Sequence, residues 1–281
     1  MGKKHVQPSL LNRILSEIPI RYDQRYTLAH KKPWLCLVKD KIWPCDPELL
    51  HERIQKALLL DEYQPRGDRL LYLRSRDKFT VLPSGRPRRP EEALERLLVQ
   101  TNPDTMYGQM PIGGGKESVD IVKLESNTGT FIELKPWHSS NSPLYALLES
   151  LKNLGLYRIL QARNHRGCEI IQNVQLAILA PVTYYQAYHL LDEDMQLSNS
   201  DNVQAFLDSV AKIFQVDIRL NVIDWPENEL WDVCSQICPG EIFKNKIISV
   251  AEYPAVEALK EKNWIELITV RRSNGYGTSL A

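Results

Sequence analysis

Hydrophobic positions after residue 90 change their spacing several times, and each change marks an expected element. Apolar residues recur every three or four positions in three segments, which predicts helices over 90–99, 142–162 and 203–214. Shorter apolar or alternating runs predict strands over 106–112, 118–125, 130–135, 174–179 and 216–223. The predicted order is α-β-β-β-α-β-α-β, so we expect an α/β (α+β) fold in which helices cover both faces of a mixed sheet.

The stretch 82–90 contains three prolines and a glycine, which neither a helix nor a central strand accommodates. We therefore place a boundary here, between an accessory N-terminal α+β domain of residues 1–85 and a second domain of residues 86–281. In the first domain the pattern predicts strands over 34–39, 70–73 and 79–82, and a helix from Asp46 to Leu60.

The composition is that of a globular protein, with 43% hydrophobic and 25% charged residues in 281. Lysine and arginine number 35 and aspartate and glutamate 35, which disfavours a protein that coats nucleic acid through bulk charge but permits an enzyme with a local basic groove. Five cysteines without a paired CxxC motif argue against a disulfide framework and a zinc site. No apolar run approaches the ~18 residues of a membrane helix, and no secretory signal begins the chain, so we expect a cytoplasmic protein.

Two acidic residues and a lysine lie on the two strands of a predicted hairpin, as Asp120, Glu133 and Lys135. Because side chains alternate along a strand, Glu133 and Lys135 share one face. A four-residue turn over 126–129 pairs Asp120 with Lys135 and adds it to the same face. The core-facing side is then formed by Val119, Ile121, Ile132 and Leu134. Two carboxylates and an ammonium group are therefore expected to converge at one end of the hairpin.

This constellation suits a hard divalent cation, because Mg²⁺ takes oxygen ligands and keeps several waters. A nearby lysine can orient a water molecule or stabilise a charged transition state. The pattern thus predicts metal-assisted hydrolysis of a phosphodiester bond. The alternative is a surface hairpin whose charges form solvated ion pairs of little energetic value.

At these residues the sequence resembles the PD-(D/E)XK nuclease superfamily over roughly residues 90–225. The resemblance rests on Val119–Val122 (VDIV) and Phe131–Lys135 (FIELK), between two helices; a valine stands where the family motif has proline before its aspartate. It implies a restriction-endonuclease-like core of order αβββαβ and a nuclease that uses Mg²⁺, with Mn²⁺ as a substitute, to cut DNA. A catalytically inactive member that binds nucleic acid or protein is the alternative, and a homodimer stays open.

The resemblance also implies roles for individual residues. Asp120 and Glu133 would ligate Mg²⁺ together with the main-chain carbonyl of Leu134, and Lys135 would serve the attacking water. Many members add a glutamate from the first core helix, a place that Glu91 or Glu95 can fill here. Two further charged residues, on the helix over 142–162, are expected at the surface in preference to the site: Glu149 and Lys152.

Several basic and polar residues near this constellation are candidate DNA contacts. Arg86, Arg88 and Arg89 directly precede the helix over 90–99 and can clamp phosphates, or can belong to a solvated linker. Lys116 ends a glycine-rich stretch that lacks the Ser or Thr of a P-loop, so it is either a phosphate contact or part of a plain turn. Trp137 either stacks on a base or caps the sheet edge, and His138 beside it is the remaining candidate.

Overall fold

A six-stranded mixed sheet runs through the centre of the computed structural model, which describes residues 10–20, 27–59, 86–112, 117–198, 200–237 and 252–272. The strands lie in chain order, with β3, β4 and β5 parallel and the other neighbours antiparallel. Their bounds are β1 Met106–Pro111, β2 Ser118–Glu125, β3 Thr128–Leu134, β4 Asn173–Pro181, β5 Asp217–Ile223 and β6 Ile265–Val270.

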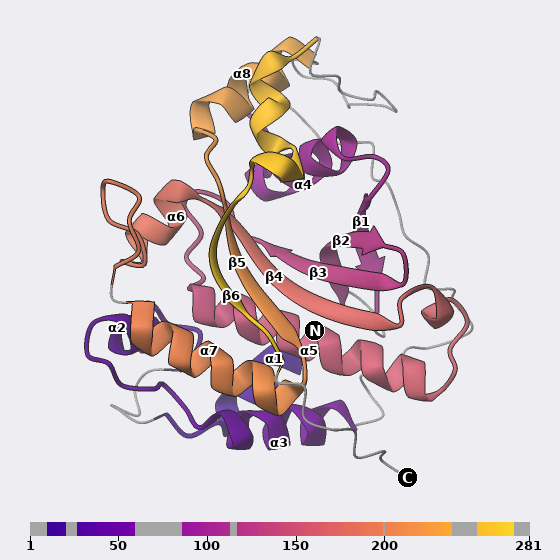
Figure 1. Ribbon diagram of the computed structural model, residues 1–281, viewed down its shortest axis with the longest axis vertical. Coiled ribbons are helices and arrows are strands. Elements are labelled where there is room, and N and C mark those ends of the chain that lie inside the picture. The colour runs from indigo at the N-terminus through magenta and orange to yellow at the C-terminus, as the bar shows by residue number, and fades with distance from the viewer. Residues whose placement is uncertain are drawn as a thin grey trace, which may run out of the picture.

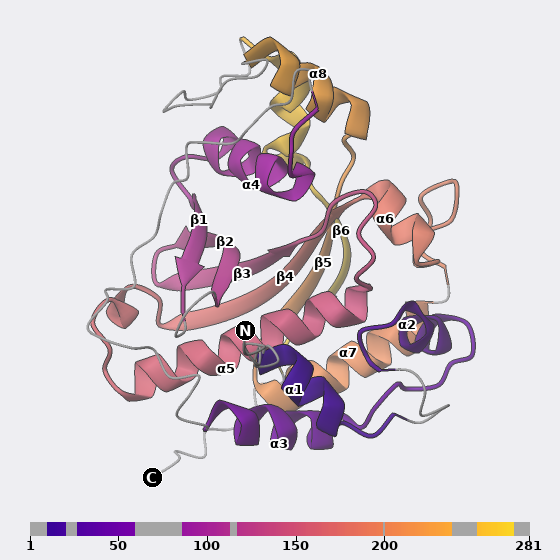
Figure 2. The same cartoon turned by 180° about the vertical axis from the view of Figure 1, so that it is seen from behind.

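Helices cover both faces of this sheet, as Figures 1 and 2 show from opposite sides. On one face lie α5 and α7, with α1, α2 and α3 packed behind them, and on the other face lie α4, α8 and η3. The α-helices are α1 Leu10–Glu17, α2 Lys31–Val38, α3 Pro47–Leu58, α4 Pro90–Thr101, α5 Pro143–Ala162, α6 Val182–Ala187, α7 Ser200–Phe214 and α8 Glu227–Ile237. The 3-10 helices are η2 Cys168–Ile170, η3 Pro254–Leu259 and η4 Glu261–Asn263. The predicted mixed sheet flanked by helices is confirmed.

The helix starts follow the local sequence signals. The Ser142 hydroxyl accepts a hydrogen bond from the main-chain N–H of Tyr145 at 3.3 Å, and Pro143 occupies the first helical position of α5. The Asp46 carboxylate accepts from the N–H of Glu48 at 2.8 Å in the same way at the start of α3. These caps end the preceding loops and thereby fix where the helices begin against the sheet.

The predicted strand over 34–39 is wrong, because this segment belongs to α2. Trp34, Leu37 and Val38 lie buried on the helix, and the indole N–H of Trp34 donates to the carbonyl oxygen of Tyr188 at 2.8 Å. A short apolar run fits a buried helix as well as a strand, and packing decided the outcome here. The predicted strands over 70–73 and 79–82 lie outside the described residues.

The hairpin of β2 and β3 has a shorter turn than predicted. Glu125 pairs with Thr128 across a two-residue turn, with Ser126 at φ 53°, so the predicted pairing of Asp120 with Lys135 is wrong by two residues. Two-residue turns with positive φ suit the twist of antiparallel strands, which favours this geometry over a four-residue loop. A shift of two preserves the alternation, so the register continued by one residue sets Asp120 level with Glu133; that their side chains share one face stays a prediction.

One core position on β2 also differs from the prediction. Ile121, Ile132 and Leu134 pack on the α4 side of the sheet, as expected together, but Val119 joins the hydrophobic cluster on the α5 side. The pairing of β2 with β3 ends at Ile121 and Ile132, so the strict alternation of sides no longer holds at Val119. Asp120 lies at this point of divergence.

Helices α1 to α3 share one hydrophobic cluster with α5 and α7. Helices α3 and α5 approach each other tightly at Gly155 of α5, where an added Cβ would lie 2.2 Å from Cδ1 of Leu58 in α3. The N-terminal helices thus form the outer support of α5. The division of the chain after residue 85 stays a prediction.

Two expectations from composition concern cysteines and membranes. The four cysteines within the described ranges, Cys36, Cys45, Cys168 and Cys234, are buried and unbridged. Among the helices in the described part of the chain, none combines the length and apolarity needed to cross a membrane.

Candidate active site

The predicted residues meet where β3 ends and where α4 and α5 begin on opposite faces of the sheet. Glu133 is on β3, and Lys135 directly follows that strand, with its main-chain N–H still donating to the carbonyl of Leu179 on β4 at 3.0 Å. Asp120 comes from the adjacent β2, and Glu149 from the second turn of α5. Two strands of the sheet, the residue directly after β3 and the covering helix α5 therefore supply one small cluster.

Lys135 is the centre of this cluster. Its Nζ donates to Oε1 of Glu133 at 2.6 Å and to Oε2 of Glu149 at 2.8 Å. The Lys135 side chain is 4% exposed and that of Glu133 8%, whereas that of Glu149 is 24% exposed. The ammonium group is thus held by two carboxylates in a nearly dry setting. The reading of these charges as a solvated surface ladder does not fit this burial.

Asp120 joins the cluster through the main chain of β3. Its Oδ2 accepts a hydrogen bond from the N–H of Leu134 at 3.1 Å, just beyond the last paired position of the hairpin. The carboxylate therefore replaces a missing ladder acceptor and turns towards β3. The contact to Leu134 is through its N–H; the role of its carbonyl as a metal ligand stays a prediction.

The ionisation of these groups reflects their crowding. Burial raises the pKa of Glu133 well above its usual range, and the charge of Asp120 raises it further. Burial likewise raises the pKa of Asp120, opposed by the charge of Lys135. Burial alone would lower the pKa of Lys135, but Glu133, Glu149 and Asp120 together raise it well above the ordinary value. The site has more negative groups than its one lysine can compensate.

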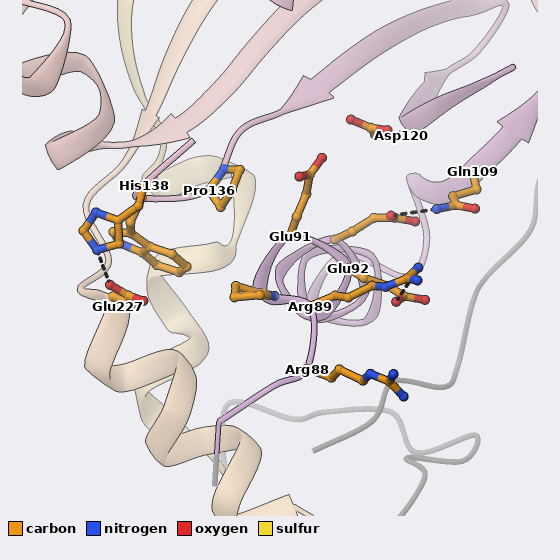
Figure 3. A pocket seen from close by; sticks show the side chains of 12 residues that line it. Arg88, Arg89, Glu91, Glu92, Gln109, Asp120, Pro136, His138 and Glu227 are labelled. Atoms are coloured by element: carbon orange, nitrogen blue, oxygen red, sulfur yellow. Dashed lines mark hydrogen bonds and ion pairs between the residues drawn. The ribbon is translucent and has the colours of Figure 1, made fainter. Parts of the chain in front are cut away.

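A pocket of about 560 Å³ opens beside Asp120 (Figure 3). Its walls come from the start of α4, from β1 and β2, from the segment after β3 and from the start of α8. Glu91 extends from α4 towards Asp120 in this view. Desolvation by the surrounding protein raises the pKa of the Glu91 carboxyl; the charge of Lys135 opposes that rise, and Asp120 and Glu149 add to it.

Both helix glutamates line the pocket, and the charges of Lys135, Asp120 and Glu149 act on the pKa of Glu91. Glu95 is 3% exposed and its Oε2 accepts from Nε2 of Gln109 at 3.2 Å, across the pocket wall.

The candidate DNA contacts divide between the pocket and other places. Arg88, Arg89 and His138 line the pocket, and Nε2 of His138 lies 2.7 Å from Oε2 of Glu227. Trp137 also lines it, but the indole is 4% exposed and donates to the carbonyl of Trp225 at 3.0 Å, as a core residue does.

The remaining two candidates are Arg86 and Lys116. The guanidinium carbon of Arg86 lies 4.1 Å from the ring centre of Trp231, and Arg86 does not line the pocket. Lys116 falls outside the described residues.

The surface positions expected for Glu149 and Lys152 are wrong. Glu149 binds Lys135, and the buried Lys152 pairs with Glu117. Helix α5 is buried nearly all round, including Ser150 and Asn153. The signal was therefore the run of polar residues within an otherwise apolar helix, since buried polar groups need partners.

Within the described ranges, no three His, Cys, Asp or Glu side chains gather into a group able to hold a metal ion. Comparison with family models, with curated proteins and with solved structures finds no match for this chain.

Proposed function

We propose that this protein is a Mg²⁺-dependent nuclease of the PD-(D/E)XK type, which hydrolyses phosphodiester bonds in DNA. The observation that carries the proposal is the buried Lys135 ammonium held between Glu133 and Glu149, with Asp120 beside them on the neighbouring strand. The element order α4-β1-β2-β3-α5-β4 supports a restriction-endonuclease-like core.

The donor set fits a hard cation. Asp120 and Glu133 offer carboxylate oxygens, and burial together with their mutual repulsion makes both anions costly without a compensating positive charge. These two residues would hold the Mg²⁺, with Glu91 facing them from α4. When bound, the ion would supply positive charge to the phosphate and would acidify a water molecule. Mn²⁺ is expected to substitute.

The residues of the chain itself then have separate tasks. Lys135 carries its positive charge next to the carboxylates, where its third N–H can orient the attacking water or bind a phosphate oxygen. Burial of Lys135 and Glu133 keeps bulk water away and strengthens these charges. Arg88 and Arg89 at the pocket provide positive charge for the flanking phosphates.

The rival function is a binding module without catalysis, and the charge of the pocket argues against it. Among the described residues, five carboxylates and two guanidinium groups line the pocket. A surface that simply binds nucleic acid gains affinity from positive charge, so this lining would repel phosphates. A divalent cation bound among the carboxylates removes much of that repulsion, which favours a metal-dependent enzyme.

The experiment is incubation of the purified protein with plasmid, linear duplex, single-stranded and branched DNA, in Mg²⁺, Mn²⁺ or EDTA. We expect cleavage in either metal and none in EDTA, and loss of cleavage in Asp120→Asn. Glu125→Gln is the matched control, because Glu125 is a carboxylate on the same strand outside the pocket. Uncut DNA in every metal, or full activity of Asp120→Asn, would contradict the proposal.

A further inference from the structure

Lys135 contacts an oxygen that the proposed metal would also need. Glu133 has two carboxylate oxygens, and Oε1 accepts from the Lys135 ammonium at 2.6 Å. A lysine hydrogen-bonded to a carboxylate competes with a cation for the same negative charge. Because the Lys135 side chain is only 4% exposed, water does not readily replace a lost partner.

Glu149 offers Lys135 a second partner from a different element. Its Oε2 accepts from Nζ at 2.8 Å, and it stands on α5 while Glu133 stands on β3. The next turn of α5 is tied to the start of β2, because Lys152 pairs with Glu117 and Nδ2 of Asn153 donates to the carbonyl of Ser118 at 3.3 Å. Helix α5, which carries Glu149, is therefore held to the start of β2 by contacts that do not involve Glu133.

We propose that Lys135 and the metal compete for Glu133, and that Glu149 settles the competition by retaining the ammonium when the metal binds. This inference rests on the proposed function. A cation on Glu133 and Asp120 repels the nearby ammonium group, and Glu149 offsets that repulsion. Without the Glu149 charge, Lys135 either stays on Glu133 and excludes the metal or becomes a buried cation without a close anion. Glu149 is thus a positioning residue that controls metal entry.

The test measures Mn²⁺ affinity of the full chain by electron paramagnetic resonance, without reference to DNA cleavage. Glu149→Gln is expected to weaken Mn²⁺ binding about tenfold or more, which corresponds to at least ~1.4 kcal/mol. Glu117→Gln is the matched control, because it neutralises the partner of another buried lysine, Lys152, on the same helix. It is expected to change the affinity less than about twofold.

The decisive step is a double-mutant cycle with Lys135→Met. Removal of the competing ammonium should tighten Mn²⁺ binding, and Glu149→Gln added to Lys135→Met should then cost less than about threefold. Lys123→Met reports the general effect of removing a buried positive charge from the hairpin. If Glu149→Gln does not fold, Lys135→Met alone still tests the competition, because tightening no greater than that of Lys123→Met contradicts it.

The outcomes separate this inference from the proposed function. If Glu149→Gln weakens Mn²⁺ binding as much with Met at 135 as with lysine, Glu149 is a direct ligand and the inference is wrong. If Glu149→Gln has no effect, the inference is wrong as well. In both cases cleavage by the wild type and its loss in Asp120→Asn still support the nuclease. If the wild type binds Mn²⁺ no better than Asp120→Asn and cuts no DNA, both proposals fall.

Discussion

Two buried lysines lie on β2 and directly after β3, and their surroundings differ. Lys123 and Lys135 are 8% and 4% exposed, and each pairs with two carboxylates. The partners of Lys123 are open to water, with Glu125 62% and Glu261 34% exposed. The cluster around Lys135 is drier and adds Asp120 and Glu91 to its two partners.

This difference separates a structural ion pair from a candidate site. At Lys123 water screens the two carboxylates, so no further positive charge is needed. At Lys135 several carboxylates crowd one ammonium group next to a pocket. A buried lysine with two acidic partners does not by itself indicate a catalytic site. An excess of buried carboxylates over nearby positive charges does.

Replacement of each lysine in turn by methionine should give the largest difference in activity between the two clusters. Lys135→Met is expected to lower kcat for DNA cleavage by about 10³-fold, because a preorganised charge at the reacting centre is lost. Lys123→Met should leave kcat within about threefold, although it also removes the lysine partner of two carboxylates, Glu125 and Glu261. Cleavage rates under saturating DNA, with circular dichroism to verify folding, check both. Equal losses in the two variants would erase the distinction between the clusters.

Metal should stabilise the protein through one cluster only. At a free Mn²⁺ concentration about 100 times the dissociation constant, we expect the free energy of unfolding to rise by about 2.7 kcal/mol. The rise should vanish in Asp120→Asn and in Glu133→Gln, and should persist in Glu125→Gln. Thermal unfolding with and without Mn²⁺ measures it. Retention of the full rise in Glu133→Gln would remove that residue from the ligand set.

Without metal, neutralisation should have opposite effects in the two clusters. Because burial raises the pKa of Asp120, its ionisation destabilises the fold as pH rises through that value. Asp120→Asn should therefore raise Tm by about 2 °C at pH 7, and the gain should disappear below the ordinary aspartate pKa of about 3.9. Glu125→Gln should not raise Tm at either pH. Calorimetry in EDTA at both pH values decides; a lower Tm for Asp120→Asn at pH 7 would contradict the repulsion.

A substitution in the turn between β2 and β3 should have the smallest effect on stability. We expect it to affect the two lysine clusters equally. Ser126 has φ 53°, a left-handed conformation that glycine adopts without strain. Ser126→Gly is expected to stabilise the protein by about 0.5 kcal/mol, since relief of strain exceeds the added entropy of the unfolded chain. Urea unfolding measures this, and Ser16→Gly, in helix α1, should destabilise instead.

The sequence predicted most of the sheet and the acidic pair, because alternation and capping residues are local signals. Pro90, Ser142 and the apolar run of β4 each gave an element in its correct place. The local sequence could not decide the conformation of 34–38, since five apolar residues suit a helix or a strand until their packing is known.

The site was predictable in part for the same reason. Parity along two strands predicted Asp120 and Glu133 on one face despite an error in turn length. Glu149 was missed because its contact with Lys135 spans two elements and depends on how α5 lies over β3. Trp137 was ambiguous from sequence, since only packing against Trp225 shows that it is buried.

The tight approach of Gly155 to Leu58 has a consequence for dissecting the chain. Removal of the first 85 residues would expose the apolar surface of α5, the helix that carries Glu149, where α1, α2 and α3 now pack against it. Such a truncated protein should aggregate on expression even though every residue of the carboxylate cluster is retained. We therefore expect the N-terminal helices to keep the protein in solution. A deletion experiment that removes them would lose activity through aggregation, and this loss could be mistaken for removal of catalytic residues.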